Sequence, residues 1–315
     1  MSEPTVTRTN SRLAARCRHP TQVRTGSLAT KGQAYRHSPL FPNWAGCPSV
    51  GEVSWAAGTD GWFEDRFPGP DLDRTTWFPH YLPGWSSRAE TRASFHMDNN
   101  GLTLEIPVDH PVWCAEDHEP PLRVSGLQSG TWSGPVGTTH GQQRFREGQV
   151  VREEQERFEG WLPTGGRVEI SARMQLSPRS MAALWMSGFE DDDAQERCGE
   201  LCVFEIFGNA LGPADEPSAE VGVGIKAFRD PALRQDFAAP RLPIDVVEPH
   251  LYAVEWDADH AVFTVDGVVV RRCADPPTYP LQLMLAIFDF PQDSVGGDDH
   301  LVPRLVVDRI AGTRS

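Results

Sequence analysis

Two carboxylates within an apolar stretch are the part of the sequence best suited to chemistry. Glu200 and Glu205 lie in the segment 199–208, whose other residues are typical of a buried strand. A charge in such a run costs free energy unless something compensates for it. Strand side chains alternate between faces, so a regular strand would place Glu200 and Cys202 on one face and Glu205 on the other. We predict a β-bulge at Val203 and Phe204 that brings the three side chains to one face.

Two carboxyl groups close together on one face are suited to the hydrolysis of glycosidic bonds. A separation of about 5–5.5 Å suits a retaining mechanism, and about 6.5–9.5 Å an inverting one. The roles need split pKa values, with the nucleophile ionised and the acid protonated near the working pH. Two nearby carboxylates resist double ionisation, which helps to hold that proton. The alternative is that both side chains simply point outward from a strand.

The segment 199–208 reads Gly-Glu-Leu-Cys-Val-Phe-Glu-Ile-Phe-Gly. It resembles the active-site strand of glycoside hydrolase family 16, the laminarinase and lichenase family, whose motif is Glu-x-Asp-x-x-Glu. Other segments similar to the family follow in the family's order, and they are 62–77, 122–130, 166–174, 183–186 and 250–256. The resemblance runs from about Trp62 to the C-terminus. It implies an all-β fold, a concanavalin A-like β-jelly-roll of two curved antiparallel sheets with a glycan cleft along the concave face.

The resemblance also implies roles for individual residues. Glu200 matches the family's nucleophile, and Glu205 matches its general acid/base. Cys202 stands where the family has Asp, and a thiol is a weak donor that adds no third carboxylate. This departure is expected to cost rate, shift the pH optimum or mark a catalytically silent relative. Met181 stands where the family places a sugar-stacking Trp, and Lys226 stands near where it often carries His.

Aromatic side chains that could stack on sugar faces are numerous in this sequence. The candidates for the cleft are Trp85, Trp113, Trp132, Trp185 and Phe207, with Met181 and Lys226 at the subsite next to the cleaved bond. Core packing is the other interpretation of a Trp in an all-β protein, and we expect it for Trp77 and Trp256. Lys226 would either hydrogen-bond a ligand such as an acidic sugar or be solvated at a strand edge.

Alternating hydrophobicity predicts the strands that position these residues. The segment 166–174 alternates cleanly, with Val168, Ile170, Ala172 and Met174 expected to point inward. Further strands are expected in 101–107, 220–228, 279–288 and 305–310, and a hairpin in 261–270 with Asp266-Gly267 as a type I′ turn. Residues 131–160 are turn-rich and polar, and we interpret them as an insertion over one rim of the sandwich.

Composition agrees with such a fold and excludes some partners. The chain has 315 residues with 28 Gly, 27 Pro and 10 Trp, which fits many short strands and turns. The net charge of −15 argues against a nucleic acid partner. No apolar run approaches the roughly 20 residues of a membrane helix. The six cysteines, Cys17, Cys47, Cys114, Cys198, Cys202 and Cys273, are scattered, and we expect free, mostly buried thiols.

The first 50 residues differ from the rest of the chain. They carry seven Lys and Arg against the single acid Glu3, with no apolar periodicity. We interpret residues 1–50 as a disordered basic tail and residues 51–315 as the β-sandwich domain. A transit-type segment, or upstream sequence translated from an early start codon, are the alternatives. No signal peptide or transmembrane segment is visible, so the sequence suggests the cytoplasm whereas the family usually acts outside the cell.

Together these features predict a retaining endo-β-glycosidase that hydrolyses a β-linked glucan or galactan. The alternatives are a jelly-roll glycan-binding protein that has lost catalysis, and a transglycosylase that uses the same residues. The expected partner is a β-linked polysaccharide or oligosaccharide, with no nucleic acid, no membrane and a monomeric state. No cofactor is expected for catalysis. The family often carries a structural calcium, whose ligands the sequence does not identify, and the acidic stretch 190–193 is expected to be an exposed turn.

Overall fold

The computed structural model describes residues 61–191 and 194–314. These residues form an all-β jelly-roll sandwich of two antiparallel sheets, one of eight strands and one of six. The predicted tail at 1–50 lies outside the described residues, as do residues 51–60 of the predicted domain. Within the described part of the chain, no helix has the length and apolar character needed to cross a membrane.

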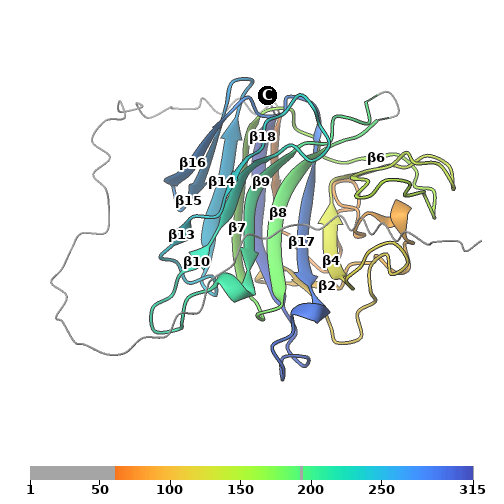
Figure 1. Cartoon of the computed structure of the whole chain (residues 1–315). Helices are drawn as coiled ribbons and strands as arrows, with labels where there is room; N and C mark the ends of the chain where they lie inside the picture. Colours follow the sequence, from red (N-terminus) through yellow and green to blue (C-terminus); the bar gives the residue numbers. More distant parts are fainter. Residues whose placement is uncertain (1–60, 192–193, 315) are drawn as a thin grey trace, which may run out of the picture. The chain divides into compact units, whose positions relative to one another are not determined.

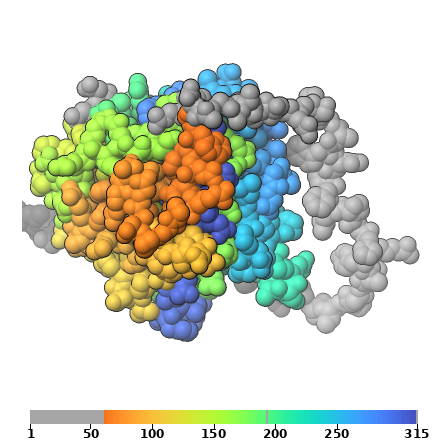
Figure 2. Space-filling model, turned by 180° about the vertical axis from the view of Figure 1, so that it is seen from behind, coloured from red at the N-terminus to blue at the C-terminus, as the bar shows by residue number. Residues whose placement is uncertain are grey.

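The eight-stranded sheet joins strands from both ends of the described chain. Its order is β16 (Val268–Ala274), β15 (His260–Val265), β14 (His250–Trp256), β7 (Gly166–Gln175), β18 (Arg304–Arg314), β3 (Gly101–Glu105) and β2 (Phe95–Asp98), and β1 (Trp62–Asp65) also pairs with β18. In the view from behind, the orange residues that follow residue 60 lie against the blue C-terminal strands (Figure 2).

The six-stranded sheet carries the two glutamates. Its order is β12 (Asp236–Ala238), β11 (Gly222–Lys226), β9 (Glu200–Phe207), β8 (Ser180–Gly188), β17 (Leu281–Asp289) and β4 (Arg123–Gln128). Strands β9, β8 and β17 lie side by side at the centre of Figure 1. We call the face of this sheet that is turned away from the eight-stranded sheet the cleft face.

Short elements complete the described fold. They are the pair β5 (Gly130–Thr131) and β6 (Phe158–Glu159), the pair β10 (Ala219–Glu220) and β13 (Arg241–Leu242), and the 3-10 turns η1 (Pro83–Trp85), η2 (Gly208–Ala210) and η3 (Pro291–Asp293). Residues 131–160 are mostly irregular, as the turn-rich sequence predicts, and β6 lies beyond β4 at the side of the six-stranded sheet (Figure 1).

The main core lies between the two sheets and follows the predicted alternation. On β7, Val168, Ile170, Ala172 and Met174 are at most 1% exposed, so the predicted inward face is confirmed. Trp77 and Trp256 also belong to this core, as expected. Burial of this many apolar side chains is the main favourable term in folding.

A second apolar cluster covers the cleft face, and it explains why β8 is buried along its whole length. Met181, Ala183 and Trp185 of β8 point to this cluster, whereas the residues between them point to the main core. Loop residues such as Leu82 and Trp113 pack over the strand from outside. A strand covered on both sides reads as a continuous apolar run rather than as an alternating one.

Smaller predictions about turns and cysteines are also confirmed. Asp266 and Gly267 have φ values of 49° and 76° between β15 and β16, as a type I′ turn requires. The four cysteines in the described part of the chain are free and buried. Cys17 and Cys47 lie outside it.

Candidate active site

A β-bulge in β9 places the carboxylates, as the sequence predicts. Against β8, Leu184 pairs with Phe204 but the next residue, Trp185, pairs with Cys202. Against β11, the register shifts between Gly222 and Gly224 in the same way. The pairing of β9 with each neighbouring strand therefore contains one extra residue in β9, at the predicted position.

The bulge sorts the side chains of β9 between the two faces. The adjacent side chains of Val203 and Phe204 both lie in the main core. Cys202 belongs to the cluster on the cleft face. Glu200 and Glu205 both line a cavity on that face, so the prediction that one face carries the three side chains is confirmed.

This cavity has a volume of about 260 Å³, and we call it the cleft cavity. Its floor is formed by side chains of β8, β9 and β17, among them Ala183, Trp185 and Phe288. Its walls come from loops that lie far from these strands in sequence, through Tyr81 and Phe145. A concave site lined by apolar and aromatic side chains with a few convergent polar groups is typical of ligand binding.

The neighbours of Glu205 in the sheet are small, which leaves room for its side chain. Glu205 is in register with Ala183 on one side and Gly222 on the other. A Cβ atom on Gly222 would lie 3.1 Å from the Cβ of Glu205 and 2.6 Å from the ring of Phe237. Glycine at this position therefore keeps the space beside the carboxylate open.

Lys226 brings the charge that balances this pair. Its Nζ donates a hydrogen bond to Oε1 of Glu205, and it lies 4.7 Å from the ring centroid of Phe237. Negative charges around the ammonium, including Glu205 and Glu200, hold the pKa of Lys226 above its ordinary value despite desolvation. The interpretation of Lys226 as a merely solvated lysine at a strand edge is therefore wrong, because the residue lines the cleft cavity and is ion-paired.

Glu200 is half-buried and also lines the cleft cavity. Burial raises its pKa to about 7, and the charge of Glu205 acts in the same direction. The charge of Lys226 and a hydrogen bond from Gln143 oppose this rise. The donor is Nε2 of Gln143, 2.7 Å from Oε1 of Glu200. Such a carboxyl group changes its charge near neutral pH.

Cys202 lies between the two glutamates and is fully buried. Burial and the nearby charge of Glu205 raise the pKa of its thiol well above the ordinary value. A thiol that stays protonated is a poor nucleophile. The sulfur is therefore poorly suited to act as a nucleophile in this environment.

The predicted sugar-binding residues separate into two sets. Trp113, Trp185, Met181 and Lys226 line the cleft cavity. Phe207 packs beside it, with its ring 6.0 Å from that of Phe290. Trp85 and Trp132 do not line the cleft cavity; Trp132 stays a candidate for the cleft, whereas Trp85 has almost no exposed surface on which a sugar could stack. Trp85 is only 1% exposed, because its Nε1 donates to the carbonyl of Gln142 inside the loop cluster.

Several residues that line the cleft cavity are not among the site residues that the sequence predicts. They are Tyr81, His118, Gln143, Phe145, Phe288 and Phe290. Phe288 was assigned only to a strand, and the others lie in segments without periodicity. Tyr81 contacts Trp113, Trp185 and Phe288, with ring centroids 5.1, 6.3 and 5.6 Å apart. Burial raises the pKa of Tyr81, and the charges of the two glutamates act in the same direction.

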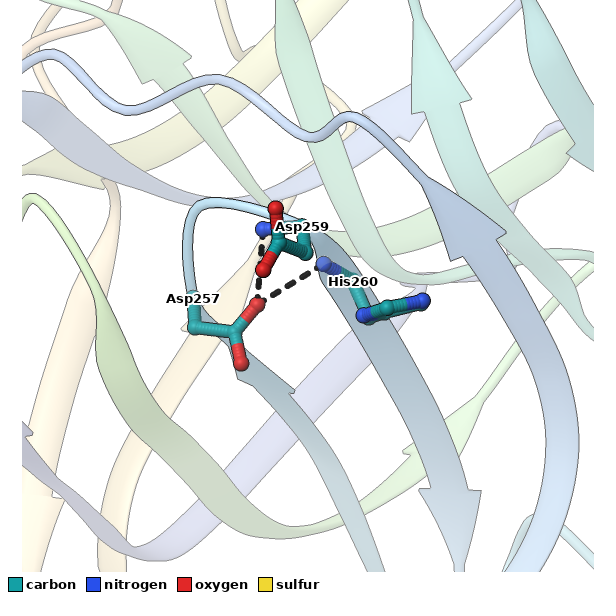
Figure 3. A group of neighbouring side chains, drawn as sticks. All are labelled: Asp257, Asp259 and His260. Atoms are coloured by element: carbon teal, nitrogen blue, oxygen red, sulfur yellow. Dashed lines mark hydrogen bonds between the residues drawn. The ribbon is translucent and has the colours of Figure 1, made fainter.

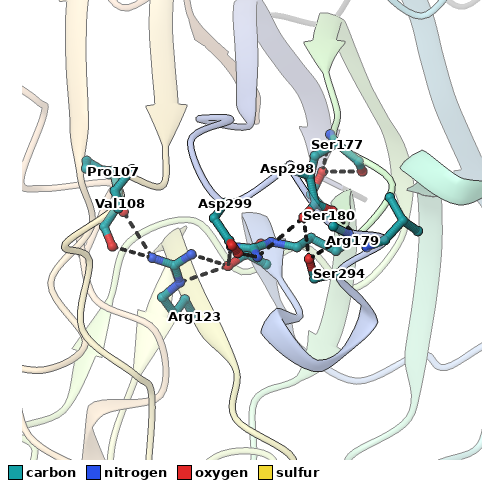
Figure 4. Close-up of polar contacts among 12 residues, drawn as sticks. Pro107, Val108, Arg123, Ser177, Arg179, Ser180, Ser294, Asp298 and Asp299 are labelled. Atoms are coloured by element: carbon teal, nitrogen blue, oxygen red, sulfur yellow. Dashed lines mark hydrogen bonds and ion pairs between the residues drawn. The ribbon is translucent and has the colours of Figure 1, made fainter.

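A buried ion-pair network fixes the end of β17 where the aromatic wall continues. Arg123 and Arg179 both donate to the carboxylate of Asp289, at 2.8 and 2.7 Å. Arg123 also donates to the carbonyl oxygens of Pro107 and Val108, and Arg179 reaches Asp299 in the loop after η3 (Figure 4). Asp289 stands between Phe288 and Phe290 in the sequence, so the network anchors the end of β17 next to these two residues.

The expected calcium site is not identified by the described residues. Asp257, Asp259 and His260 form one group with metal-ligand atoms within 4.8 Å of one another (Figure 3). All three are exposed, and Asp257 accepts the backbone N–H groups of the other two, at 2.8 Å each, as in a turn between β14 and β15. Turn formation accounts for this arrangement, so the structural calcium stays a prediction.

The expectation of an exposed acidic turn at 190–193 is wrong for its first residue. Glu190 is 0% exposed, and its Oε2 pairs with Nη2 of Arg229 at 2.6 Å. Its Oε1 accepts the backbone N–H of Gln143. Asp191 is about half exposed and pairs with Arg157. Asp192 and Asp193 lie outside the described residues.

Comparison with solved structures reveals several proteins of the same fold. An endo-β-galactosidase from Clostridium perfringens that releases GlcNAcα1-4Gal superposes with a TM-score of 0.63 at 24% identity. The match covers 80% of this chain and 63% of that protein. The present chain thus spans less than two thirds of its length.

Two glucanases superpose over more of their own length. The catalytic domain of an endo-1,3-β-glucanase (laminarinase) from Thermotoga petrophila matches with a TM-score of 0.55 at 16% identity, over 80% of this chain and 96% of that one. A non-specific endo-β-1,3(4)-glucanase described as a member of family GH16 matches with a TM-score of 0.52 at 14% identity, over 80% and 91%. These likenesses show a common fold. The sequence matches no protein-family model and no curated protein.

Proposed function

We propose that this chain is a retaining endo-β-glycosidase of the family 16 kind that hydrolyses a β-linked glucan or galactan. The observation that carries the proposal is the bulge in β9, which aims Glu200 and Glu205 into one aromatic cavity. Bulges beside active sites re-aim side chains in this way.

In the proposed reaction, Glu200 attacks the anomeric carbon and forms a glycosyl-enzyme. Glu205 protonates the leaving oxygen and then deprotonates the incoming water. In the structure Glu205 accepts a hydrogen bond from Lys226. Glu205 must therefore leave this ion pair and take up a proton from solvent before it can protonate the leaving oxygen.

The aromatic walls support a sugar as the ligand. Trp113 and Trp185 offer apolar ring surface beside Tyr81, and Gln143 and Lys226 supply hydrogen-bond donors at the carboxylates. Aromatic rings can stack on the apolar faces of a pyranose, and a few polar groups can hydrogen-bond the hydroxyls at its edge. The neighbours of known activity include an endo-β-galactosidase and a laminarinase, which supports a β-linked galactan or glucan as the first substrates to test.

A glycan-binding protein without catalysis is the second candidate, and two observations favour it. Cys202 is buried and protonated where the resembling family has a carboxylate. The pKa of Glu200 is also raised to about 7, so part of this carboxyl is neutral at pH 7 and cannot attack. Such a protein would bind oligosaccharides saturably without cleaving them.

The test is release of reducing ends from β-1,3-glucan, β-1,3-1,4-glucan, galactans and carrageenan-like polymers. Wild-type protein is compared with Glu200→Gln and Glu205→Gln, because both substitutions keep the size of the side chain. We expect the Glu200 variant to lose activity and the Glu205 variant to lose about 10²–10⁴-fold. Full activity in Glu200→Gln would refute the proposed mechanism.

Product analysis then separates the remaining alternatives. NMR of the first anomer released distinguishes retention from inversion, since a retaining enzyme releases the β-anomer from a β-linked substrate. Longer products in the presence of added oligosaccharide would identify a transglycosylase. Binding on a glycan array without release of reducing ends would favour the glycan-binding protein.

A further inference from the structure

Gln143 has a backbone conformation that is rare for its residue type. Its φ is 48°, in the left-handed region that disfavours side chains with a Cβ. It lies in the turn-rich segment 131–160, where a glycine could adopt this φ without the steric penalty of a Cβ. Strained residues persist when the surrounding structure holds them, and they gather at functional sites.

Buried polar contacts hold this conformation. The backbone N–H of Gln143 donates to Glu190, whose carboxylate is 0% exposed and is paired with Arg229 at 2.6 Å. The preceding residue, Gln142, donates to the backbone carbonyl of Glu190 at 2.7 Å and accepts its backbone N–H at 3.0 Å. Gln282 on β17 also donates to Gln142, at 2.7 Å. Hydrogen bonds to Glu190 and Gln282 thus hold both the side chain of Gln142 and the backbone N–H of Gln143 in place.

With its backbone held in this way, Gln143 points its side chain into the cleft cavity. Gln143 is 5% exposed, and its Nε2 lies 2.7 Å from Oε1 of Glu200. Cys202, the neighbour of Glu200 on the same face of β9, offers only a weak S–H donor. The amide of Gln143 therefore supplies the hydrogen bond that the strand itself does not.

We propose that Gln143, held by the buried Glu190–Arg229 pair, is the positioning residue for Glu200. This inference rests on the proposed function, because it assigns Gln143 to the nucleophile of that reaction. Gln143 fixes the orientation of the carboxylate and favours its charged form, and it does so as a neutral donor that does not titrate. The contact comes from a loop 57 residues away in sequence, so the strand motif does not contain it.

Other charged and titratable groups also face Glu200 from the surrounding elements. They are Lys226 on β11, Glu205 and Cys202 on β9, Glu190 after β8, and Tyr81 in the wall. Lys226 favours the ionised form of Glu200, whereas Glu205 and Glu190 oppose it. Gln143 is the group that can be changed without altering any of these charges.

The substitution Gln143→Met tests the inference, because methionine has a similar length but no donor. Removal of a hydrogen bond to a carboxylate is expected to raise the pKa of Glu200 by about one unit. The acid limb of the pH profile of kcat/KM should therefore move up by about one pH unit. Gln149→Met is the matched control, since Gln149 accepts the backbone N–H of Phe145 in the same loop. A loosened loop lowers kcat/KM at every pH without moving the limb.

Titration of Glu200 by ¹³C NMR, in protein labelled at glutamate and assigned with Glu200→Gln, measures the same shift without turnover. A raised pKa in Gln143→Met supports the inference even if no glycan is cleaved, in which case the proposed function alone fails. An unchanged pKa in a folded Gln143→Met variant overturns the inference.

A second variant separates positioning from folding. Gln143→Gly relieves the left-handed backbone, so we expect a Tm equal to wild type or a few degrees higher. Its kcat/KM should nevertheless fall, with the same upward shift of the acid limb. A Gly variant with the wild-type profile would refute a positioning role.

Discussion

Lys226 on β11 donates a hydrogen bond to Glu205, while its Cα stands in register with Glu200. One ammonium group therefore neutralises part of the charge of both carboxylates across the strand boundary. Without this cation, two carboxylates and a buried thiol would share a half-buried cavity with no ionic partner of their own. The charge state of the site consequently depends on Lys226.

Removal of this charge should change the pH dependence of the reaction. Lys226 favours the ionised form of Glu200, so Lys226→Met raises the pKa of Glu200 above its value of about 7. We expect kcat/KM to fall more at pH 6 than at pH 8, measured on the substrate that the polymer panel identifies. Lys226→Arg keeps the charge and serves as the control. Equal losses at the two pH values in Lys226→Met would contradict this account.

The raised pKa of Glu200 also predicts a pH-dependent stability. Between the ordinary value of 4.5 and about 7, the folded protein holds a proton on Glu200 that the unfolded chain has lost. The stability contributed by this group is therefore fully present below pH 4.5 and is lost as the pH rises through 7. Glu200→Gln removes this dependence. The free energy of unfolding of the variant, relative to that of wild type, should therefore be higher at pH 8 than at pH 5, by up to about 3 kcal/mol.

Urea unfolding of both proteins at the two pH values measures this difference. Glu216→Gln provides the control, because Glu216 is an exposed residue in the loop between η2 and β10. A Glu200→Gln difference that is the same at pH 5 and pH 8 would show that the carboxyl does not titrate in this range.

The proposed roles of Glu200 and Glu205 predict that a substrate with a good leaving group restores activity to one variant and not to the other. An aryl glycoside with a dinitrophenyl leaving group needs no protonation, so Glu205→Gln should recover most of its glycosylation rate on such a substrate. Glu200→Gln should stay inactive on it, because the nucleophile is missing. The measurement is the initial burst of dinitrophenol, and rescue of the Glu200 variant instead would exchange the two roles.

The buried thiol at the centre of the site should be dispensable for the chemistry. Because the pKa of Cys202 is raised and the side chain is 0% exposed, it should resist iodoacetamide in the folded protein. Cys202→Ala should keep activity within about tenfold of wild type, since no step uses the sulfur. Peptide mapping of alkylated protein identifies the modified cysteines, and inactivation that follows labelling of Cys202 would argue for a thiol nucleophile.

The strand-borne half of the site could be predicted from the sequence for a simple reason. Strand side chains alternate, so an apolar run with carboxylates five residues apart leaves few registers that avoid burying a charge. That constraint predicts the bulge and the shared face of Glu200 and Glu205, and the structure has both. The same alternation predicts β7, whereas β8 is covered on both faces and reads as a continuous apolar run.

The half of the site supplied by loops could not be predicted in this way. Gln143 and Tyr81 reach the cavity through loop conformations that no periodicity encodes. Glu190 was expected at the surface because it begins an acidic stretch, yet its contacts with Arg229 and a loop N–H keep it buried. Trp85 was assigned to the cleft because its residue type suits sugars, although a buried carbonyl satisfies its N–H.

The bulge in β9 has a consequence for motion along the strand as well as for the direction of its side chains. A regular strand can slip by two residues against its neighbours and still present the same faces. In β9 the kink must stay opposite Leu184 on one side and between Gly222 and Gly224 on the other. Val203 and Phe204 fill the core at that point, with Phe204 4.7 Å from the ring of Tyr252. The extra residue thus fixes the register of β9 against both neighbouring strands, and with it the position of both carboxylates along the cleft.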